Sequence, residues 1–229
     1  MIKIENTEVY GWKASIRGLR NPMNSWDKSD TLFDGNMFCM GDNDLKLMKC
    51  LAKAGSDHRK FLRMITVTVD ITAPIYWWKE FDTYKVGTVA NSCSTMHKIH
   101  AKEFTLDDFS HEHLTPAAIA ALSTVVERLN FARKQFLKGR TDSDFGMPCA
   151  KDYWWDMIQL LPASYNQRRT VQLNYEVFAN IYFARRNHKL DEWHTFCDWI
   201  LKLPYFEEIM GLEDGKNAEK ANDGNDNVL

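Results

Sequence analysis

Two asparagines and one arginine in an apolar stretch are the residues best suited to chemistry in this sequence: Asn174, Asn180 and Arg185. If the stretch is helical, Asn174 and Arg185 lie about three turns apart on one face, with Asn180 toward its side. Amides and a guanidinium on one face can recognise a flat heterocycle through its carbonyl and imide edges. The same spacing is expected of a polar helix face that is exposed to solvent and binds no ligand. The spacing alone favours this alternative.

Cys93 and four histidines are the other side chains with reactive chemistry. Cys93 could act as a nucleophile, but no spacing rule assigns it a base, so a structural or phosphate-facing role is preferred. The histidines form two close pairs, His97 with His100 and His111 with His113. A metal site needs three or four ligands in one geometry, and no carboxylate or thiol pattern accompanies these pairs. We therefore expect solvated or capping histidines and no metal site.

Alternating helices and strands would position these residues. The clearest helix covers 44–54, where apolar residues have helical spacing and Gly55 is a C-cap. The clearest strand covers 65–71, where β-branched apolar residues alternate with Thr and Asp. The other expected elements are a strand over 3–10, a short helix that ends before Asn21-Pro22, a loop over 23–42, a polar segment over 88–95, a short strand over 169–173, and helices over 75–84, 115–138, 151–161, 175–187 and 191–201.

The composition is that of an ordinary globular protein, with 45% hydrophobic and 26% charged residues. The mixture of strands with a larger share of helices indicates one α+β domain over 1–211. The stretch 212–229 is acidic and almost free of apolar residues, so we expect it to be disordered.

Charge, apolar runs and cysteines argue against several classes of protein. The net charge of −2 gives no electrostatic basis for binding nucleic acid. The apolar runs are far shorter than the roughly 20 residues of a membrane span, and the start lacks the pattern of a signal peptide. Five scattered cysteines without a CxxC pair indicate a reduced, cytoplasmic protein. Phosphate-loop, dinucleotide, GxSxG and HExxH motifs are absent from the sequence.

Over roughly 58–199 the order of features resembles the flavin-dependent thymidylate synthases. In that family a His, an alternating strand and Ala-Pro precede a helix; after Leu-Pro, a strand leads to a helix with two Asn and an Arg, and a Trp follows. The matching features here are His58, the 65–71 strand, Ala73-Pro74, Leu161-Pro162, Asn174, Asn180, Arg185 and Trp193. This chain is one residue longer before the tryptophan, so Arg186 is an alternative to Arg185. The resemblance implies a single α+β domain with a small mixed or antiparallel sheet flanked by long helices.

The family's signature motif, RHRxxSxxExSxR, has diverged in this chain. Without gaps after Ala73-Pro74, its named residues fall on Thr83, Tyr84, Lys85, Thr88, Asn91, Cys93 and Thr95. A slip of one residue would bring Ser94 to the second Ser. Further phosphate ligands of the family fall on Glu80 and Ile158. Because each charge-assisted bond to a phosphate contributes roughly 1.5–3 kcal/mol, we expect weaker binding of a nucleotide monophosphate than is usual for the family.

The resemblance also implies roles for individual residues. The flavin would contact His58, Tyr84, Lys85, Thr88, Asn91, Asn174 and Asn180. The pyrimidine nucleotide would contact Glu80, Cys93, Ser94, Arg168 and Arg185. Arg185 or Arg186 would stabilise the polarised pyrimidine during catalysis.

Two hypotheses follow. In the first, the chain is a divergent flavin enzyme that uses FAD to transfer a one-carbon unit from methylenetetrahydrofolate to a deoxyuridylate-type nucleotide, with reduced nicotinamide as a candidate reductant and a methylated or hydroxymethylated product. In the second, it is an inactive relative that binds nucleotide or flavin, or serves as a structural oligomeric protein. By resemblance we expect a homo-oligomer, a tetramer in the family, that binds neither nucleic acid nor membrane.

Overall fold

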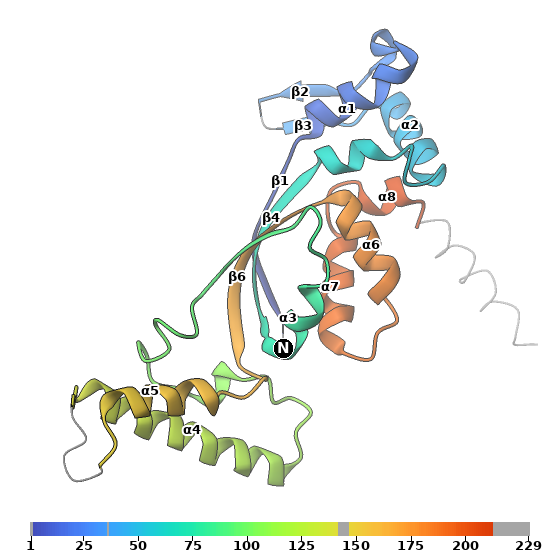
Figure 1. Cartoon of the computed structure of the whole chain (residues 1–229). Helices are drawn as coiled ribbons and strands as arrows, with labels where there is room; N and C mark the ends of the chain where they lie inside the picture. Colours follow the sequence, from blue (N-terminus) through green and yellow to red (C-terminus); the bar gives the residue numbers. More distant parts are fainter. Residues whose placement is uncertain (1, 36, 142–146, 213–229) are drawn as a thin grey trace, which may run out of the picture. The chain divides into compact units, whose positions relative to one another are not determined.

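The computed structural model describes residues 2–35, 37–141 and 147–212 (Figure 1). The acidic stretch that we expect to be disordered lies, from residue 213 onward, outside the described residues. Within the described part of the chain, no helix combines the length and the apolar composition needed to cross a membrane.

A four-stranded sheet and a separate hairpin form the β-structure of the described residues. The sheet has the order β1-β4-β6-β5, with β1 over Lys3–Tyr10, β4 over Thr66–Pro74, β6 over Asn166–Asn174 and β5 over Val89–Ser92. The alternation predicted for β4 is confirmed, because Val67, Val69, Ile71 and Ala73 are fully buried and the residues between them are not. The expected α+β class with a small sheet is therefore confirmed.

Each predicted helix is present, most of them with shifted ends, and one further α-helix, over Phe206–Met210, was not predicted. The helices are α1 over Trp12–Arg20, α2 over Asp42–Lys53, α3 over Ile75–Phe81, α4 over Pro116–Leu137, α5 over Ala150–Gln159, α6 over Tyr175–Arg185, α7 over Asp191–Leu201 and α8 over Phe206–Met210. The helix expected over 75–84 ends at Phe81, so Tyr84 lies in the segment that follows it. The strand expected over 169–173 is longer in both directions.

The expected loop over 23–42 is partly wrong. It contains a short 3-10 helix over Trp26–Lys28 and an antiparallel hairpin, β2 over Leu32–Asp34 paired with β3 over Met37–Cys39. Phe33 and Phe38 face each other in the hairpin with ring centroids 5.6 Å apart, and Phe38 lies 5.0 Å from Trp12. Cross-strand aromatic packing thus forms a strand pair where the local sequence favours turns.

The chain divides into two compact units, each assembled from three segments. Unit 1 contains Met1–Asn6, Asp70–Thr83 and Ala90–Val171; unit 2 contains Thr7–Val69, Tyr84–Val89 and Gln172–Leu229. Strands β1, β4 and β6 each continue from one unit into the other. Whether the two units fold as one cooperative domain, as the sequence suggests, stays a prediction.

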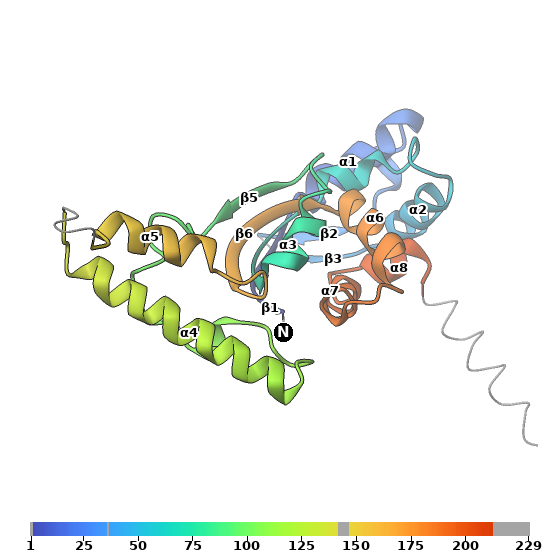
Figure 2. The same cartoon turned by 60° about the horizontal axis from the view of Figure 1, so that its bottom comes forward.

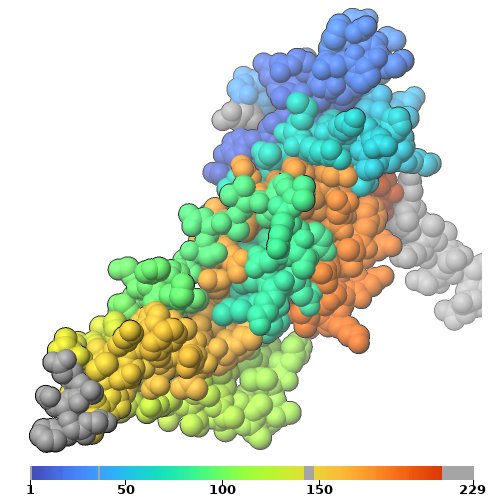
Figure 3. Space-filling model, in the orientation of Figure 1, coloured from blue at the N-terminus to red at the C-terminus, as the bar shows by residue number. Residues whose placement is uncertain are grey.

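Unit 1 is built around the packing of α4 on α5, which run side by side (Figures 1 and 2). Their yellow-green and yellow surfaces adjoin in Figure 3. Thr115 begins α4 as its N-cap and accepts a hydrogen bond from the Ala118 N–H, and Pro116 follows at the first position. The buried side chains between α4, α5 and the preceding segment are Ile99, Phe104, Phe109, Leu122, Val126, Leu129, Ala132 and Met157. Burial of this apolar face stabilises the pair of helices.

Unit 2 has an aromatic core and a buried ion pair. Trp193, Phe196, Phe178 and Phe206 are fully buried, and the buried Tyr175 donates its hydroxyl to the Pro204 carbonyl over 2.8 Å. This core fixes α6 and α7 against each other and so determines where the ends of α6 lie.

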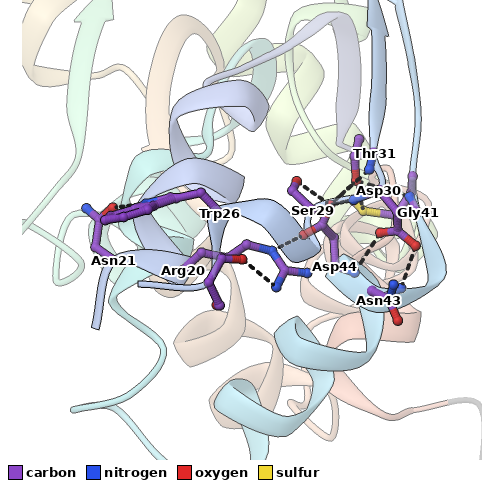
Figure 4. A network of polar contacts seen from close by, with 11 residues as sticks. Arg20, Asn21, Trp26, Ser29, Asp30, Thr31, Gly41, Asn43 and Asp44 are labelled. Carbon is purple, nitrogen blue, oxygen red and sulfur yellow. Dashed lines mark hydrogen bonds and ion pairs between the residues drawn. The ribbon is translucent and has the colours of Figure 1, made fainter. Parts of the chain in front are cut away.

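The ion pair joins α1 to α2 (Figure 4). Arg20 donates from Nε to Asp44 Oδ1 over 2.6 Å, and both side chains are more than nine-tenths buried. The other oxygen of Asp44 accepts from Ser29, Thr31 and the Asp30 backbone N–H. Burial of the Asp44 carboxyl raises its pKa, but the hydrogen bonds from Thr31, Arg20 and Ser29 outweigh this and leave the pKa below its ordinary value.

Candidate functional site

Helix α6 carries the predicted asparagines and arginine in unit 2. Asn174 is the N-cap of α6: its side-chain oxygen accepts the Val177 N–H over 3.1 Å. Arg185 is the last residue of the same helix. Asn174 therefore has a local structural role that the sequence analysis did not assign, because a cap satisfies one of the backbone donors left unpaired at a helix start.

The segment 84–89 lies against the start of α6. Gly87 has a φ of +77°, and a Cβ at this position would lie 2.8 Å from Asn174 Nδ2. Glycine is thus required both by the backbone conformation and by the close approach to the cap residue. The next residue, Thr88, has a buried hydroxyl with no hydrogen-bond partner among the described residues. Such a group indicates either a water or a bound ligand.

The same segment also reaches the end of α6. Arg185 donates from Nε to the Tyr84 hydroxyl over 2.9 Å. Its guanidinium carbon lies 4.9 Å from the centroid of the Trp193 ring and 5.7 Å from that of Tyr84. The two rings meet edge to face at 6.3 Å. Arg185 is therefore held by two aromatic rings and a hydroxyl, an arrangement in which the cation faces electron-rich surfaces. We call Tyr84, Arg185 and Trp193 the Arg185 cluster.

Arg186 lies outside the Arg185 cluster. Its side chain is exposed, and its guanidinium carbon lies 5.9 Å from the Tyr182 ring and 5.7 Å from the Phe183 ring. Of the two arginines carried over from the resemblance, Arg185 has the defined surroundings expected of a recognition residue.

Asn180 and His58 lie near a residue that the sequence analysis missed. Arg59 donates to Asn180 Oδ1 over 3.4 Å and to the Glu176 carboxylate over 3.1 Å. Glu176 is buried in the first turn of α6, and buried carboxylates are normally paired. In the sequence, this pairing could have been suspected from Glu176 alone, because it is a charged residue between the apolar Tyr175 and Val177. His58 itself is exposed, and its backbone N–H donates to the Gly55 carbonyl.

In unit 1, three predicted substrate residues line one pocket of about 660 Å³: Cys93, Ser94 and Arg168. Lys3, Lys98 and Lys102 also line it, together with Asp107, Asp108 and Tyr165. Glu80 is half-buried on α3, and Asn91 is exposed on β5; neither lines this pocket. The pocket is therefore a polar cavity with both signs of charge in its wall.

Three of the cations that line this pocket have carboxylate partners: Arg168, Lys3 and Lys102. Arg168 pairs with Asp70 over 2.8 Å and with Glu5 over 3.4 Å. Lys3 pairs with Glu5 over 2.8 Å, and Lys102 pairs with Asp108. Hydrogen bonds from Thr170, Asn6 and Arg168 lower the pKa of Asp70 to about 2, so this carboxylate stays ionised at neutral pH.

Arg169, the second arginine that could supply charge in unit 1, is also occupied. It donates from Nη1 to Asp82 over 2.7 Å and from Nε to the Gln167 side chain over 3.0 Å. Its guanidinium carbon lies 4.3 Å from the centroid of the buried Trp78 ring. Arg168 and Arg169 therefore both form ion pairs, and Arg169 also packs on Trp78.

The backbone around Cys93 and Ser94 is held by ordinary structural bonds. Cys93 donates its N–H to the Arg168 carbonyl over 2.9 Å and accepts from the Gln167 side chain over 2.8 Å. Ser94 Oγ accepts the His97 N–H over 2.9 Å and lies 3.0 Å from His97 Nδ1. The contact between Ser94 and His97 is explained by the Ser94 hydroxyl capping a turn. Within 2–35, 37–141 and 147–212, no three His, Cys, Asp or Glu side chains are grouped to hold a metal ion.

Comparison with known proteins shows which solved structures share the fold of this chain. No protein-family model matches the sequence, and no curated protein matches it. A solved structure of thymidylate synthase X from Helicobacter pylori with FAD and dUMP has a TM-score of 0.62 at 13% identity, covering 92% of this chain and 97% of that chain. This chain has the fold of a flavin-dependent thymidylate synthase. A second structure of the flavin-dependent thymidylate synthase from the same organism, also complexed with FAD and dUMP, has a TM-score of 0.61 at 13% identity.

The thymidylate synthase X fold spans both units, since it covers nearly the whole chain. At this identity the likeness concerns the backbone, and the side chains must be judged by their own contacts. Those contacts differ between the two predicted groups. Unit 2 contains the Arg185 cluster, whereas Arg168 and Arg169 in unit 1 form ion pairs with carboxylates.

Proposed function

We propose that this chain is a flavin-dependent enzyme of the thymidylate synthase type, which binds FAD and transfers a one-carbon unit from methylenetetrahydrofolate to a deoxyuridylate-type pyrimidine. The observation that carries the proposal is the Arg185 cluster: a guanidinium fixed by Tyr84 and Trp193 at the end of α6. The fold shared with structures that hold FAD and dUMP supports it.

The residues near α6 fit a flavin. Thr88 offers a buried hydroxyl without a described partner, and the exposed Asn180 keeps amide hydrogens for a ring carbonyl. Lys85 is exposed and can place one positive charge against a flavin phosphate, and His58 is exposed as well. FAD, when bound, supplies the hydride chemistry of the reaction.

Arg185 would act on the pyrimidine. A guanidinium donates to carbonyl oxygens and favours negative charge that develops on them, so it polarises the ring during attack on the one-carbon unit. Its attachment to Tyr84 and Trp193 reduces the reorganisation needed when the pyrimidine binds. No nucleophilic side chain is required in this scheme, which agrees with the structural contacts found around Cys93.

A second candidate function is an inactive relative that binds nucleotide or flavin, or acts within an assembly. The ion pairs of Arg168 and Arg169 favour it, because a phosphate would have to compete with Asp70 and Asp82 for these guanidiniums. In both cases we propose a cytoplasmic homo-oligomer, a tetramer by resemblance.

Turnover separates the two candidates. Protein reconstituted with FAD and given dUMP, methylenetetrahydrofolate and reduced nicotinamide is expected to release a methylated or hydroxymethylated pyrimidine, detected by chromatography. Binding of FAD and dUMP without product would support the inactive relative. Failure to bind either ligand would refute both flavin-based proposals.

A further inference from the structure

We infer that Tyr84 is a positioning residue that sets the orientation of the Arg185 guanidinium, instead of the flavin contact that the resemblance assigns to it. The inference rests on the proposed function in one respect: the ligand that Arg185 recognises is taken to be a pyrimidine. Tyr84 stands where the family has the His of its RHR triplet, so the residue type and the role change together.

The hydrogen bond from Arg185 to Tyr84 involves the nitrogen that matters for orientation. Nε is the guanidinium nitrogen attached to the aliphatic stem, and its 2.9 Å bond to the Tyr84 hydroxyl fixes the plane of the whole group. An arginine side chain loses rotamer entropy when it is immobilised. In this protein the loss occurs on folding, so it does not weaken ligand binding.

Trp193 provides the rigid surface for this arrangement. Its side chain is fully buried in the core of unit 2, and the Arg185 guanidinium carbon lies 4.9 Å from its ring centroid. Tyr84 contacts the same ring edge to face at 6.3 Å. The hydroxyl and the indole therefore hold Arg185 in a single environment within unit 2.

The position of Tyr84 is itself determined by α6. Three residues after Tyr84, Gly87 contacts the N-cap Asn174 at the other end of the helix. The segment 84–89 thus touches both ends of α6, with Tyr84 at its last residue, Arg185, and Gly87 at its N-cap, Asn174. A shift of this segment would move the acceptor that orients Arg185.

The test compares Tyr84→Phe with Tyr182→Phe in the protein reconstituted with FAD. Tyr84→Phe keeps the ring against Trp193 but removes the acceptor, so we expect dUMP affinity to fall about tenfold with FAD affinity unchanged. Tyr182→Phe makes the same chemical change on α6 outside the Arg185 cluster and is expected to leave both affinities unchanged. Tyr84→His restores an acceptor and is expected to recover most of the dUMP affinity.

A second readout does not depend on the ligand. The ¹⁵N spectrum should show a slowly exchanging Nε–H signal that disappears in Arg185→Lys, persists in Tyr182→Phe and broadens in Tyr84→Phe. Unchanged dUMP affinity and an unchanged Nε–H signal in Tyr84→Phe would overturn the inference, as would a loss of FAD affinity with dUMP affinity kept. If the wild type bound no dUMP, the proposed function would fail, while the Nε–H signal would still decide the role of Tyr84.

Discussion

Arg168 and Arg169 in unit 1 have partners of a different kind from those described for Arg185 in unit 2. In unit 1, Arg168 and Arg169 form ion pairs with Asp70 and Asp82. In unit 2, Arg185 contacts the Tyr84 hydroxyl and the rings of Tyr84 and Trp193. A carboxylate competes with an anionic ligand for a guanidinium, whereas an aromatic ring packs against the face of the guanidinium and helps to orient it.

The difference bears on what each region can bind. A phosphate in the unit 1 pocket would meet Arg168 already bonded to an ionised Asp70, and it would be repelled by that carboxylate. A neutral pyrimidine at Arg185 would meet an oriented cation. The comparison therefore predicts that ligand recognition in this chain depends on Arg185 and that the carboxylate-paired arginines mainly support the fold.

The largest expected effect comes from the most buried carboxylate-paired arginine. Asp44→Asn leaves Arg20 buried without its counter-charge, so we expect the free energy of unfolding to fall by about 3–5 kcal/mol in denaturant titrations. Asp27→Asn makes the same chemical change at an exposed carboxylate in the 3-10 helix over Trp26–Lys28; it is the matched control and should have little effect. If the free energy of unfolding fell by less than about 1 kcal/mol in Asp44→Asn, the expectation that carboxylate-paired arginines support the fold would be contradicted.

The next effect concerns the ligand. Arg185→Ala removes the oriented guanidinium, so we expect calorimetric dUMP affinity to fall by at least about 100-fold while FAD stays bound. Arg186→Ala is the matched control, one residue along the chain with an exposed side chain, and should change affinity little. Wild-type dUMP affinity in Arg185→Ala, or an equal loss in Arg186→Ala, would contradict the role of Arg185.

The smallest expected effect is a pH dependence in unit 1. The pKa of Asp70 is lowered to about 2 in the folded protein, below its ordinary value of about 3.9. Its stabilising contribution is therefore complete above the unfolded pKa and is lost as pH falls from about 4 toward 2. Asp70→Asn should flatten the stability curve over this range, and Asp107→Asn, on the exposed rim of the same pocket, should leave it unchanged.

The sequence predicted the regular elements better than it predicted the contacts. The alternation over 65–71 and the Thr115-Pro116 start of α4 depend on local patterns, and both are confirmed. The β2–β3 hairpin was missed although the sequence offered a signal, Asp34-Gly35 between the apolar pairs Leu32-Phe33 and Met37-Phe38. The packing of Phe33 on Phe38 that supports the strand pair is visible only in the structure. The carboxylate partners of Arg168 were also out of reach, because Asp70 and Glu5 are distant in the sequence.

For the candidate site, spacing drew attention to Asn174 and Arg185, but it could not show which contacts they make. The capping bond of Asn174 follows from a helix that begins one residue later, at Tyr175. The contact between Tyr84 and Arg185 joins residues from separate elements, and helical spacing carries no information about it.

The central claim, that the region around α6 serves a flavin enzyme, is tested most directly by the visible absorbance spectrum of the purified protein. The spectrum is recorded before and after incubation with excess FAD and again after gel filtration removes the free cofactor. The account predicts that the flavin absorbance elutes with the protein and changes when dUMP is added. Protein that elutes without flavin absorbance after incubation with excess FAD would contradict it.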